Sequence, residues 1–484
     1  MKESNLQKIM LAAPNDAWFD NRHWHNFPYT FGVLNSVLKD KYEVKILDAG
    51  FENLNFEQVK QRINDYNPDV FGLTCMSMEY ARQFQKMTAL VKEVYPKTPV
   101  IVGGIYPTLL PEVIMHDKNI DYAVLGEGEY RFPKLLEKLE KNEDVNDMEG
   151  IALRLGEDIK INKVESYIQD LDALPLPNYD NLDFNNYANT TNKYSYFVYP
   201  RRLPYANTIT SRGCPFNCIF CSSKVINGPK IRYRSPESVL KEIDWLVDEK
   251  GVKEIIFMDD NFFLDHKRVK IIMNGLIERK HDLEWKNPSV AVYALNDEIL
   301  ELTRASGGYQ LILAIESGNL EGLKRLNKPT SILKKIKPIV KKARSLDFQL
   351  SGLFVIGTPG ETWEEIRNSF KLADELDLDC YSFNIATPLP KTKLYQIAKE
   401  GNFLSENFSF DNVDTRGFGR ATITTPEFTP QELQIVRAYE WDRICFSRPE
   451  KIKKIAEMNG ITLDEVDKWR KSTRRTAGTK VDYD

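Results

Sequence analysis

The strongest constraint on the fold is an alternation along the chain between short apolar runs and segments with helical spacing. In the first part, the apolar runs are Lys8–Ala13, Val44–Leu47, Asp69–Thr74, Pro99–Val102 and Tyr122–Leu125. Segments with helical spacing, such as Phe31–Leu38 and Phe56–Tyr66, lie between them. This order predicts buried strands in a doubly wound parallel sheet. In such α/β sheets, ligands bind beyond the carboxyl ends of the strands.

Glycine turns follow two of these predicted strands. Gly103-Gly104 comes after the fourth run, and Gly126-Glu127-Gly128 comes after the fifth. Glycine has no Cβ atom, so the backbone can approach a ligand closely at such turns. The two turns are therefore candidate contacts for a ligand at the carboxyl edge of the sheet.

The alternation stops between residues 145 and 205 and then begins again. The interrupted stretch is rich in proline, asparagine and aromatic residues, which predicts a linker that wraps between domains. Beyond it, the apolar runs are Asn207–Ser211, Glu254–Met258, Ser289–Tyr293, Gln310–Ile315, Gln349–Ile356 and Cys380–Ile385. Each run ends in polar or glycine-containing residues, as in α/β barrels that gather function at strand ends. Six such units predict a partial (β/α)6 barrel.

The predicted organisation therefore has four parts. Residues 1–144 form a Rossmann-like domain, residues 145–205 a linker, residues 206–392 the partial barrel, and residues 393–484 a mostly helical, charged region. The hydrophobic content of 42% suffices for sizeable cores, and 66 basic against 70 acidic residues leave a net charge of −4. This balance shows no basic surplus that would argue for nucleic acid as the main partner, and we expect none. The polar start and the lack of long apolar runs predict a cytoplasmic protein without a membrane span.

Three of the six cysteines crowd into one short segment. Cys214, Cys218 and Cys221 have the spacing C-x3-C-x2-C, so one loop can wrap around a compact centre. Thiolates suit iron–sulfur clusters or zinc. A cubane cluster usually takes four cysteines, so three would leave one iron open for chemistry. A zinc site with a distant fourth ligand is the alternative, although His266 and His281 lie far along the chain and show no paired spacing.

The other cysteines, Cys75, Cys380 and Cys445, stand alone in the sequence. Isolated cysteines of this kind are typical of buried apolar positions. We therefore predict that they are core residues.

The cysteine segment, with Phe220 just before the third cysteine, resembles the signature of the radical S-adenosylmethionine (SAM) superfamily. The resemblance implies a six-unit partial barrel whose three cysteines bind a 4Fe–4S cluster. It also implies that the open iron chelates SAM. One electron then cleaves SAM to methionine and a 5′-deoxyadenosyl radical, which abstracts a hydrogen atom from substrate.

Four further segments resemble the same superfamily in the same order: Arg232–Glu237, Phe257–Phe262, Glu316–Gly318 and Gly352–Gly360. Pro388-Leu-Pro390 departs from it, because the family commonly has glycine before the following threonine. The resemblance implies that the SAM-binding residues are Phe220, Asp259, Asp260, Glu316, Ser317 and Gly357. A turn or a helix cap is the alternative role of each polar strand end.

The first domain resembles the cobalamin-binding domain that precedes the barrel in one large class of radical SAM enzymes. The matching segments are Ile46–Asp48, Pro68–Val70, Gly72–Thr74, Val102–Thr108 and Gly126–Glu129. The implied cobalamin-binding residues are Thr74, Ser77, Gly103, Gly104, Tyr106, Gly126 and Glu127. The best-known members carry a D-x-H-x-x-G loop whose histidine ligates cobalt, whereas this chain has Asp48-Ala-Gly-Phe-Glu52. The difference suggests cobalamin without a histidine lower ligand. A flavodoxin-like domain that has lost its ligand is the alternative.

Two other features each allow two interpretations. Trp18–Tyr29, which contains His23 and His25, is either a lid or a segment that packs against the linker or barrel, and we favour packing. Asp442, Arg443 and Arg448 either line a substrate mouth or form surface ion pairs, and we favour ion pairs.

Together the resemblances predict a cobalamin-dependent radical SAM methyltransferase. It would move a methyl group from SAM, via methylcobalamin, to an unactivated carbon of a small-molecule substrate after hydrogen abstraction. The alternatives are a cyclase or rearrangement enzyme built from the same parts and, remotely, a non-catalytic cobalamin and iron–sulfur sensor. An external one-electron donor of the flavodoxin or ferredoxin type is the expected partner, with no nucleic acid or membrane. The sequence identifies no catalytic acid or base.

Overall fold

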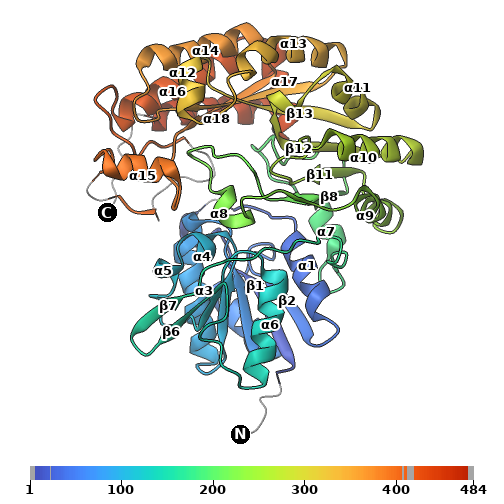
Figure 1. Ribbon diagram of the computed structural model, residues 1–484, viewed down its shortest axis with the longest axis vertical. Helices are drawn as coiled ribbons and strands as arrows, with labels where there is room; N and C mark the ends of the chain where they lie inside the picture. Colours follow the sequence, from blue (N-terminus) through green and yellow to red (C-terminus); the bar gives the residue numbers. More distant parts are fainter. Residues whose placement is uncertain (1–5, 22, 406–407, 411–418, 478–484) are drawn as a thin grey trace. The chain divides into compact units, whose positions relative to one another are not determined.

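The computed structural model describes residues 6–21, 23–405, 408–410 and 419–477 (Figure 1). The chain divides into two compact units. The N-terminal unit contains the chain through Thr190 and, in addition, Ser223–Arg232. The barrel unit contains Thr191–Ser222 and the chain from Tyr233 onward. The predicted linker, residues 145–205, is therefore shared between the two units.

The N-terminal unit is built on one sheet of seven strands in the order β2-β1-β3-β4-β5-β6-β7. The strands are β1 (Lys8–Ala13), β2 (Glu43–Asp48), β3 (Val70–Thr74), β4 (Val100–Gly103), β5 (Tyr122–Val124), β6 (Ile151–Leu155) and β7 (Asp158–Ile161). β1 to β5 are parallel, with Ile9 paired to both Val44 and Val70. This arrangement confirms the predicted parallel α/β sheet. β6 and β7 continue it as antiparallel strands.

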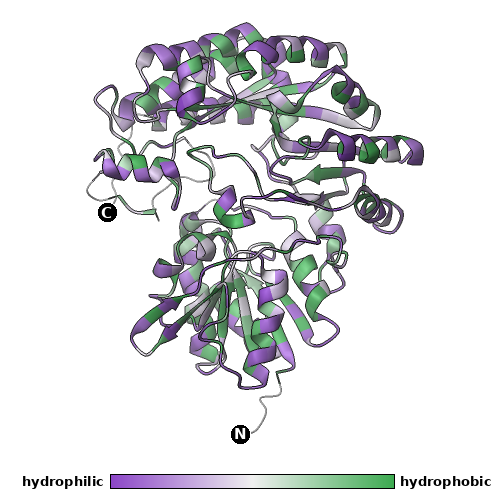
Figure 2. Cartoon of the chain, viewed as in Figure 1, coloured by the Kyte–Doolittle hydropathy of each residue, from purple (hydrophilic) through white to green (hydrophobic). Residues whose placement is uncertain are grey.

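The helices of the N-terminal unit bury apolar residues, except Ser223–Asn227, which buries none. They are α1 (Tyr29–Leu38), α2 (Phe56–Tyr66), α3 (Ala81–Val94), α4 (Ile105–Leu109), α5 (Pro111–Ile114), α6 (Gly128–Glu140), α7 (Phe184–Asn189) and α8 (Ser223–Asn227). In α2, Asn55 and Gln58 form a capping box, and Val59, Ile63 and Tyr66 are the buried residues. Figure 2 shows that hydrophobic and hydrophilic residues are interspersed along the helices.

The hairpin formed by β6 and β7 lies where the sequence predicted a linker. Its second strand, Asp158–Ile161, has no fully buried side chain, so it lacks the apolar run by which the other strands were found. β6 buries Ile151, Ala152 and Leu153, but three residues are too few to separate a strand from a loop by periodicity.

The barrel unit contains a six-stranded parallel sheet in the order β15-β14-β13-β12-β11-β8. Its strands are β8 (Tyr205–Thr208), β11 (Glu254–Phe257), β12 (Glu284–Ala291), β13 (Gly308–Glu316), β14 (Gln349–Ile356) and β15 (Cys380–Ile385), with short strands β9 (Ser211–Arg212) and β10 (Arg232–Tyr233) nearby in the sequence. The order confirms the predicted six-unit partial barrel. β12 begins at Glu284, earlier than predicted, because the buried polar residues Lys286 and Asn287 hide its first half from a hydrophobicity pattern.

The helices of the barrel unit follow the strands in alternation and then continue alone. They are α9 (Pro236–Asp248), α10 (His266–Arg279), α11 (Asp297–Ala305), α12 (Leu320–Arg325), α13 (Ile332–Ser345), α14 (Trp363–Leu376), α15 (Lys393–Glu400), α16 (Pro430–Cys445), α17 (Pro449–Asn459) and α18 (Leu463–Thr476). The last four confirm the predicted helical C-terminal region. Across the described ranges, no helix combines the length and apolar character needed to cross a bilayer.

Candidate functional site: a cysteine loop and a glycine-lined sheet edge

The three clustered cysteines lie on a loop of the barrel unit that follows β9. We call residues 213–221 the cysteine loop. Cys214 and Cys218 are half-buried and Cys221 is exposed, and none of the three forms a disulfide. Asn261, just beyond β11, donates its Nδ2 hydrogen to Cys214 Sγ at 3.0 Å. Free thiols with a hydrogen-bond donor to sulfur fit an iron–sulfur cluster, whose potential such donors tune.

The zinc alternative needs a fourth ligand, and the two candidate histidines are engaged elsewhere. His266 Nε2 lies 2.7 Å from the carbonyl oxygen of Ala294, and His281 Nε2 lies 3.0 Å from Asp244 Oδ1. Within the described part of the chain, no three His, Cys, Asp or Glu side chains are arranged as ligands of a single metal ion.

Asp259, at the end of β11, anchors the start of the cysteine loop. Its carboxylate accepts hydrogen bonds from the backbone N–H and hydroxyl of Thr210, at 3.1 and 2.7 Å, and from the hydroxyl of Ser211. Burial raises the pKa of Asp259, and the three donors counteract this shift. Arg268 donates to the carbonyl oxygen of Thr210 at 2.9 Å. The Asp259 oxygens are thus occupied, whereas the neighbouring Asp260 is exposed.

A buried ion pair lies beside the cysteine loop. Lys328 Nζ is 2.7 Å from Glu316 Oε1, and the two side chains are 14% and 8% exposed. The same ammonium group lies 5.5 Å from the centre of the Phe220 ring. Burial would lower the pKa of Lys328, but Glu316 and Cys218 together raise it above its ordinary value. The pair therefore places a fixed positive charge next to the predicted SAM-binding residues.

Sequence reasoning missed Lys328, because it lies on a connecting segment without a recognisable motif. Glu316 was found, and the structure adds that its φ of 69° turns the chain sharply at the end of β13. Ser317 is fully buried, and its hydroxyl lies 3.4 Å from the backbone N–H of Asn319. The end of β13 is thus a polar turn with a defined backbone conformation.

The glycine turn after β14 is held by a buried carboxylate. Gly357 has a φ of 85°, and a Cβ atom there would lie 2.2 Å from Leu433 Cδ2. The N–H groups of Gly357 and Thr358 donate to Glu361 Oε2 at 2.6 and 3.0 Å. Burial raises the pKa of Glu361 to about 7. These contacts explain why the predicted contact at Gly357 has to be glycine.

Two turns at the carboxyl edge of the N-terminal sheet contain a glycine with a positive φ, and we call this edge the ligand edge. Gly104 has a φ of 101°, and a Cβ atom there would lie 2.7 Å from the carbonyl oxygen of Cys75. Gly126, with a φ of 71°, donates its N–H to Thr108 Oγ1 at 2.9 Å. Both glycines have a positive φ, the conformation that favours glycine, and both lie half-buried beyond the carboxyl ends of their strands. The edge thus fits the approach of a large planar group such as a corrin ring.

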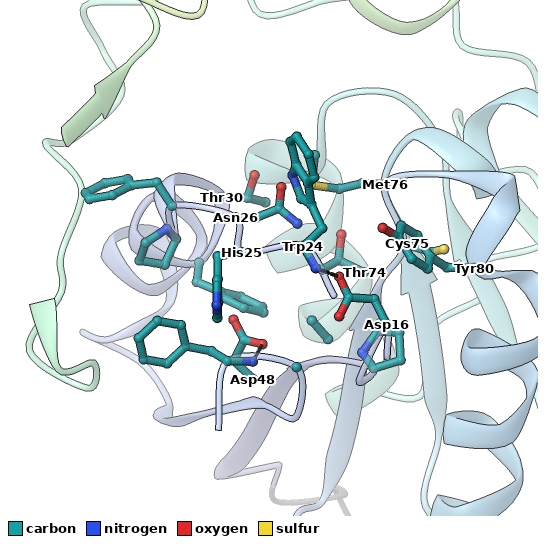
Figure 3. A pocket seen from close by; sticks show the side chains of 17 residues that line it. Asp16, Trp24, His25, Asn26, Thr30, Asp48, Thr74, Cys75, Met76 and Tyr80 are labelled. Carbon is teal, nitrogen blue, oxygen red and sulfur yellow. Dashed lines mark hydrogen bonds between the residues drawn. The ribbon is translucent and has the colours of Figure 1, made fainter. Parts of the chain in front are cut away.

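A cavity of about 90 Å³ opens at the ends of β1, β2 and β3, next to this edge (Figure 3). His25, Asp48 and Thr74 are among the side chains that line it. Asp48 accepts hydrogen bonds from Tyr187 Oη and the Phe51 N–H, both at 2.9 Å. Burial and the neighbouring His23 lower the pKa of His25 to about 4, so its imidazole is neutral at pH 7.

The predicted cobalamin-binding residues have different surroundings. Thr74 lines the cavity, and Ser77 accepts a hydrogen bond from the Glu79 N–H at 3.3 Å, beside the short helical turn Met78–Tyr80. Gly103 ends β4, Gly104 lies between β4 and α4, and Gly126 follows β5. Tyr106 is 1% exposed and packs against Phe84, and the carboxylate of Glu127 is buried in an ion pair with Arg232. The last two therefore lie inside the unit.

The aromatic segment before α1 packs as expected. Phe27 makes edge-to-face contacts with Tyr179 and Phe184, which belong to the predicted linker. The contacts of His23 in this segment are polar. Its Nδ1 lies 2.8 Å from Asp16 Oδ1, and its Nε2 lies 3.1 Å from the ring nitrogens of His25. Packing against the linker is confirmed, and the same segment forms part of the cavity wall.

The C-terminal charges form ion pairs, as favoured from the sequence. Arg443 pairs with Asp374 and Glu440, and Arg448 pairs with Asp377. Asp442 binds Arg470 and Arg474 of α18. Cys75, Cys380 and Cys445 are buried, as predicted.

The buried carboxyl group of Asp48 leads to a prediction about stability and pH. Burial raises the pKa of Asp48 from 3.8 to about 6. At pH values between these two, the folded state holds a proton that the unfolded state has lost. The free energy of unfolding therefore falls as the pH rises through about 6, by about 3 kcal/mol in total. We expect Asp48→Asn to remove this loss, because the amide stays neutral. Urea unfolding across this pH range measures the effect.

The exposed Asp40→Asn is the matched control and should leave the pH dependence of unfolding as in the wild type. A wild-type stability that is constant through pH 6, or an Asp48→Asn profile parallel to it, would contradict the prediction.

Two protein-family models match this chain, and each match contains one of the two candidate sites. Residues 208–373 match the Radical SAM superfamily, and residues 26–136 match the B12 binding domain. The uncharacterised methyltransferase PH0819 of Pyrococcus horikoshii is 31% identical over 378 residues, or 78% of this chain and 79% of that protein. Cytidylyl-2-hydroxyethylphosphonate methyltransferase of Streptomyces wedmorensis is 29% identical over 437 residues, or 80% of this chain and 81% of that protein.

A solved structure shares the whole architecture. The radical SAM methyltransferase TsrM from Kitasatospora setae, determined with cobalamin and a [4Fe-4S] cluster bound, matches with a TM-score of 0.75 at 15% identity. The match covers 98% of this chain and 99% of TsrM. The cofactors that the family implies are a 4Fe–4S cluster, SAM and cobalamin. The chain belongs to the radical SAM superfamily, in the class whose barrel follows a B12-binding domain.

Proposed function

We propose that the protein is a cobalamin-dependent methyltransferase that places a methyl group from SAM on an unactivated carbon of a small molecule. The observation that carries the proposal is one chain that provides both a free three-cysteine loop and a glycine-lined ligand edge. An unactivated carbon is a poor nucleophile, so it needs a radical and a methyl donor held within reach of one another. Two curated relatives named as methyltransferases support the same reaction class.

Different residues of the barrel unit would bind the cluster and hold the loop that carries it. Cys214, Cys218 and Cys221 would hold the cluster, and Asn261 would donate its hydrogen bond to one of the three sulfurs. Asp259 and Arg268 hold the start of the cysteine loop. When bound, the cluster supplies the electron that splits SAM, and cobalamin supplies a methyl carrier.

SAM itself would be held by the polar strand ends. The Lys328–Glu316 pair and Asp260 provide charges of both signs for its amino and carboxylate groups. Phe220 provides an apolar wall, and the Gly357 turn provides a close backbone approach. In the N-terminal unit, Thr74, Ser77, Gly103, Gly104 and Gly126 would contact cobalamin. An external one-electron donor of the flavodoxin or ferredoxin type would reduce the cluster.

Anaerobic reconstitution with iron, sulfide and a cobalamin tests the proposal. We expect corrinoid absorption bands beside the iron–sulfur shoulder, and 5′-deoxyadenosine when SAM and a reductant are added. Incubation with extracts of candidate metabolites should give a product heavier than its precursor by one methylene unit. Deuterium-labelled SAM would show that the added carbon comes from its methyl group.

The alternatives predict other outcomes. A cyclase or rearrangement enzyme would give 5′-deoxyadenosine with a product that has lost hydrogens or kept its mass. A sensor would bind both cofactors and produce no 5′-deoxyadenosine at all. Purified protein containing zinc in place of iron and sulfide would end the enzymatic interpretation.

A further inference from the structure

The segment that directly follows the third cysteine leaves the barrel unit. Ser223–Arg232 packs as part of the N-terminal unit, whereas Cys221 and Ser222 belong to the barrel unit. We call Ser223–Arg232 the anchored segment. Two residues of fully extended chain span at most about 7 Å, so Cys221 cannot move far from whatever holds Ser223. The attachment of the anchored segment therefore restrains one end of the cysteine loop.

A buried ion pair holds the far end of this segment. The Nη1 group of Arg232 donates to both carboxylate oxygens of Glu127, at 2.7 and 2.9 Å, and the two side chains are 5% and 4% exposed. Arg232 also donates to the carbonyl oxygens of Ile168 and Asn227, both at 2.6 Å. The Ile168 N–H in turn donates to Glu127 at 2.7 Å. Both carboxylate oxygens accept from one nitrogen of Arg232, and removing one partner of such a desolvated pair is costly.

The middle of the anchored segment packs against the ring of Tyr167. Gly228 has a φ of 87°, and a Cβ atom there would lie 3.1 Å from three atoms of the Tyr167 ring. The guanidinium carbon of Arg232 lies 5.2 Å from the centre of the same ring. Tyr167 thus contacts the segment at two points, and a side chain at position 228 would press on its ring and strain the backbone.

Glu127 connects this anchor to the ligand edge. It is the residue between Gly126, whose turn forms part of that edge, and Gly128, which begins α6. We propose that Glu127 and Arg232 are positioning residues, which hold the segment that follows the cysteine loop against the turn after β5. The inference rests on the proposed function, because we expect these residues to affect how often SAM cleavage is followed by methyl transfer.

The tests are Glu127→Gln and Arg232→Gln, with Asp121→Asn as the matched control. Asp121 lies in the same unit, pairs with Lys92 of α3 at 2.8 Å and accepts a hydrogen bond from the Val100 N–H of β4 at 2.7 Å, so its partners are separate from those of the anchored segment. Hydrogen exchange of the holoenzyme, read by mass spectrometry, should accelerate about tenfold or more across residues 223–232 in both test variants. The control should exchange there as the wild type does.

The functional readout is the amount of methylated product formed for each 5′-deoxyadenosine. We expect both test variants to bind cobalamin and to cleave SAM, while this ratio falls about fivefold or more as radicals are lost to other reactions. Arg232→Lys should restore part of the ratio, because the charge and one hydrogen bond remain.

Several outcomes would overturn the inference. A segment that exchanges faster with an unchanged product ratio would show that the anchor does not act on the reaction. Loss of cobalamin in Glu127→Gln, with Arg232→Gln normal, would make Glu127 a direct cobalamin contact instead. If Glu127→Gln does not fold, Arg232→Lys and Gly228→Ala carry the test. If the wild type makes no methylated product, the proposed function fails, and the anchor is then judged from exchange and from the electron paramagnetic resonance signal of the cluster with SAM.

Discussion

Cys214→Ala is expected to remove the cluster and with it all cleavage of SAM. The side chain is one of three thiols on the cysteine loop, and Asn261 donates a hydrogen bond to its sulfur. Two remaining cysteines cannot hold a cubane that already has one ligand fewer than usual. Iron and sulfide analysis of reconstituted protein, together with chromatography for 5′-deoxyadenosine after reduction by dithionite, measures the effect.

Cys445→Ala is the matched control, because Cys445 is a free cysteine buried at the end of α16, in a different part of the same unit. It should keep the iron content and the 5′-deoxyadenosine yield of the wild type. If Cys214→Ala still produced 5′-deoxyadenosine, the assignment of the cysteine loop to the cluster would be wrong.

Lys328→Met is expected to lower both stability and SAM cleavage. It leaves the carboxylate of Glu316, which is 8% exposed, without its cationic partner. Breaking a buried pair from one side costs about 3–5 kcal/mol. It also removes the positive charge beside Phe220 that we propose for SAM binding. Denaturant unfolding measures the first effect, and the concentration of SAM needed for half-maximal 5′-deoxyadenosine formation measures the second.

The double variant Glu316→Gln/Lys328→Met separates these two effects. Replacing both partners removes the unpaired charge, so most of the lost stability should return. The requirement for SAM should stay raised, because neither charge has been restored. If the double variant recovered both properties, the pair would have only a structural role and its place in SAM binding would be withdrawn.

Local features of the sequence were enough for most of the framework. The strands Lys8–Ala13, Gln349–Ile356 and Cys380–Ile385 were located to the residue, because each is a short apolar run between breaks. The strand at Glu284–Ala291 was found only in its second half. Its polar residues Lys286 and Asn287 are buried because distant backbone carbonyl groups accept their hydrogen bonds, and a window of neighbouring residues cannot show such partners.

In the functional site, too, the features that are local in the sequence could be predicted, whereas contacts between distant residues could not. The cysteines and the glycine turns are contiguous in the sequence, so their motifs could be read directly. Lys328, which pairs with Glu316, and Arg232, which pairs with Glu127, are recognisable only once the chain has folded. Asp259 was predicted as a SAM contact from its position at a strand end, but the hydroxyl groups that occupy its oxygens come from another strand end.

The return of Ser223–Arg232 to the N-terminal unit has a consequence for protein engineering. That unit is not contiguous in the sequence, so a fragment cut at Thr190 would lack the guanidinium that neutralises an interior carboxylate. Grafting the first 190 residues onto another barrel as a cassette would therefore transplant an incomplete domain. A successful chimera has to carry the short stretch after the last clustered cysteine along with it.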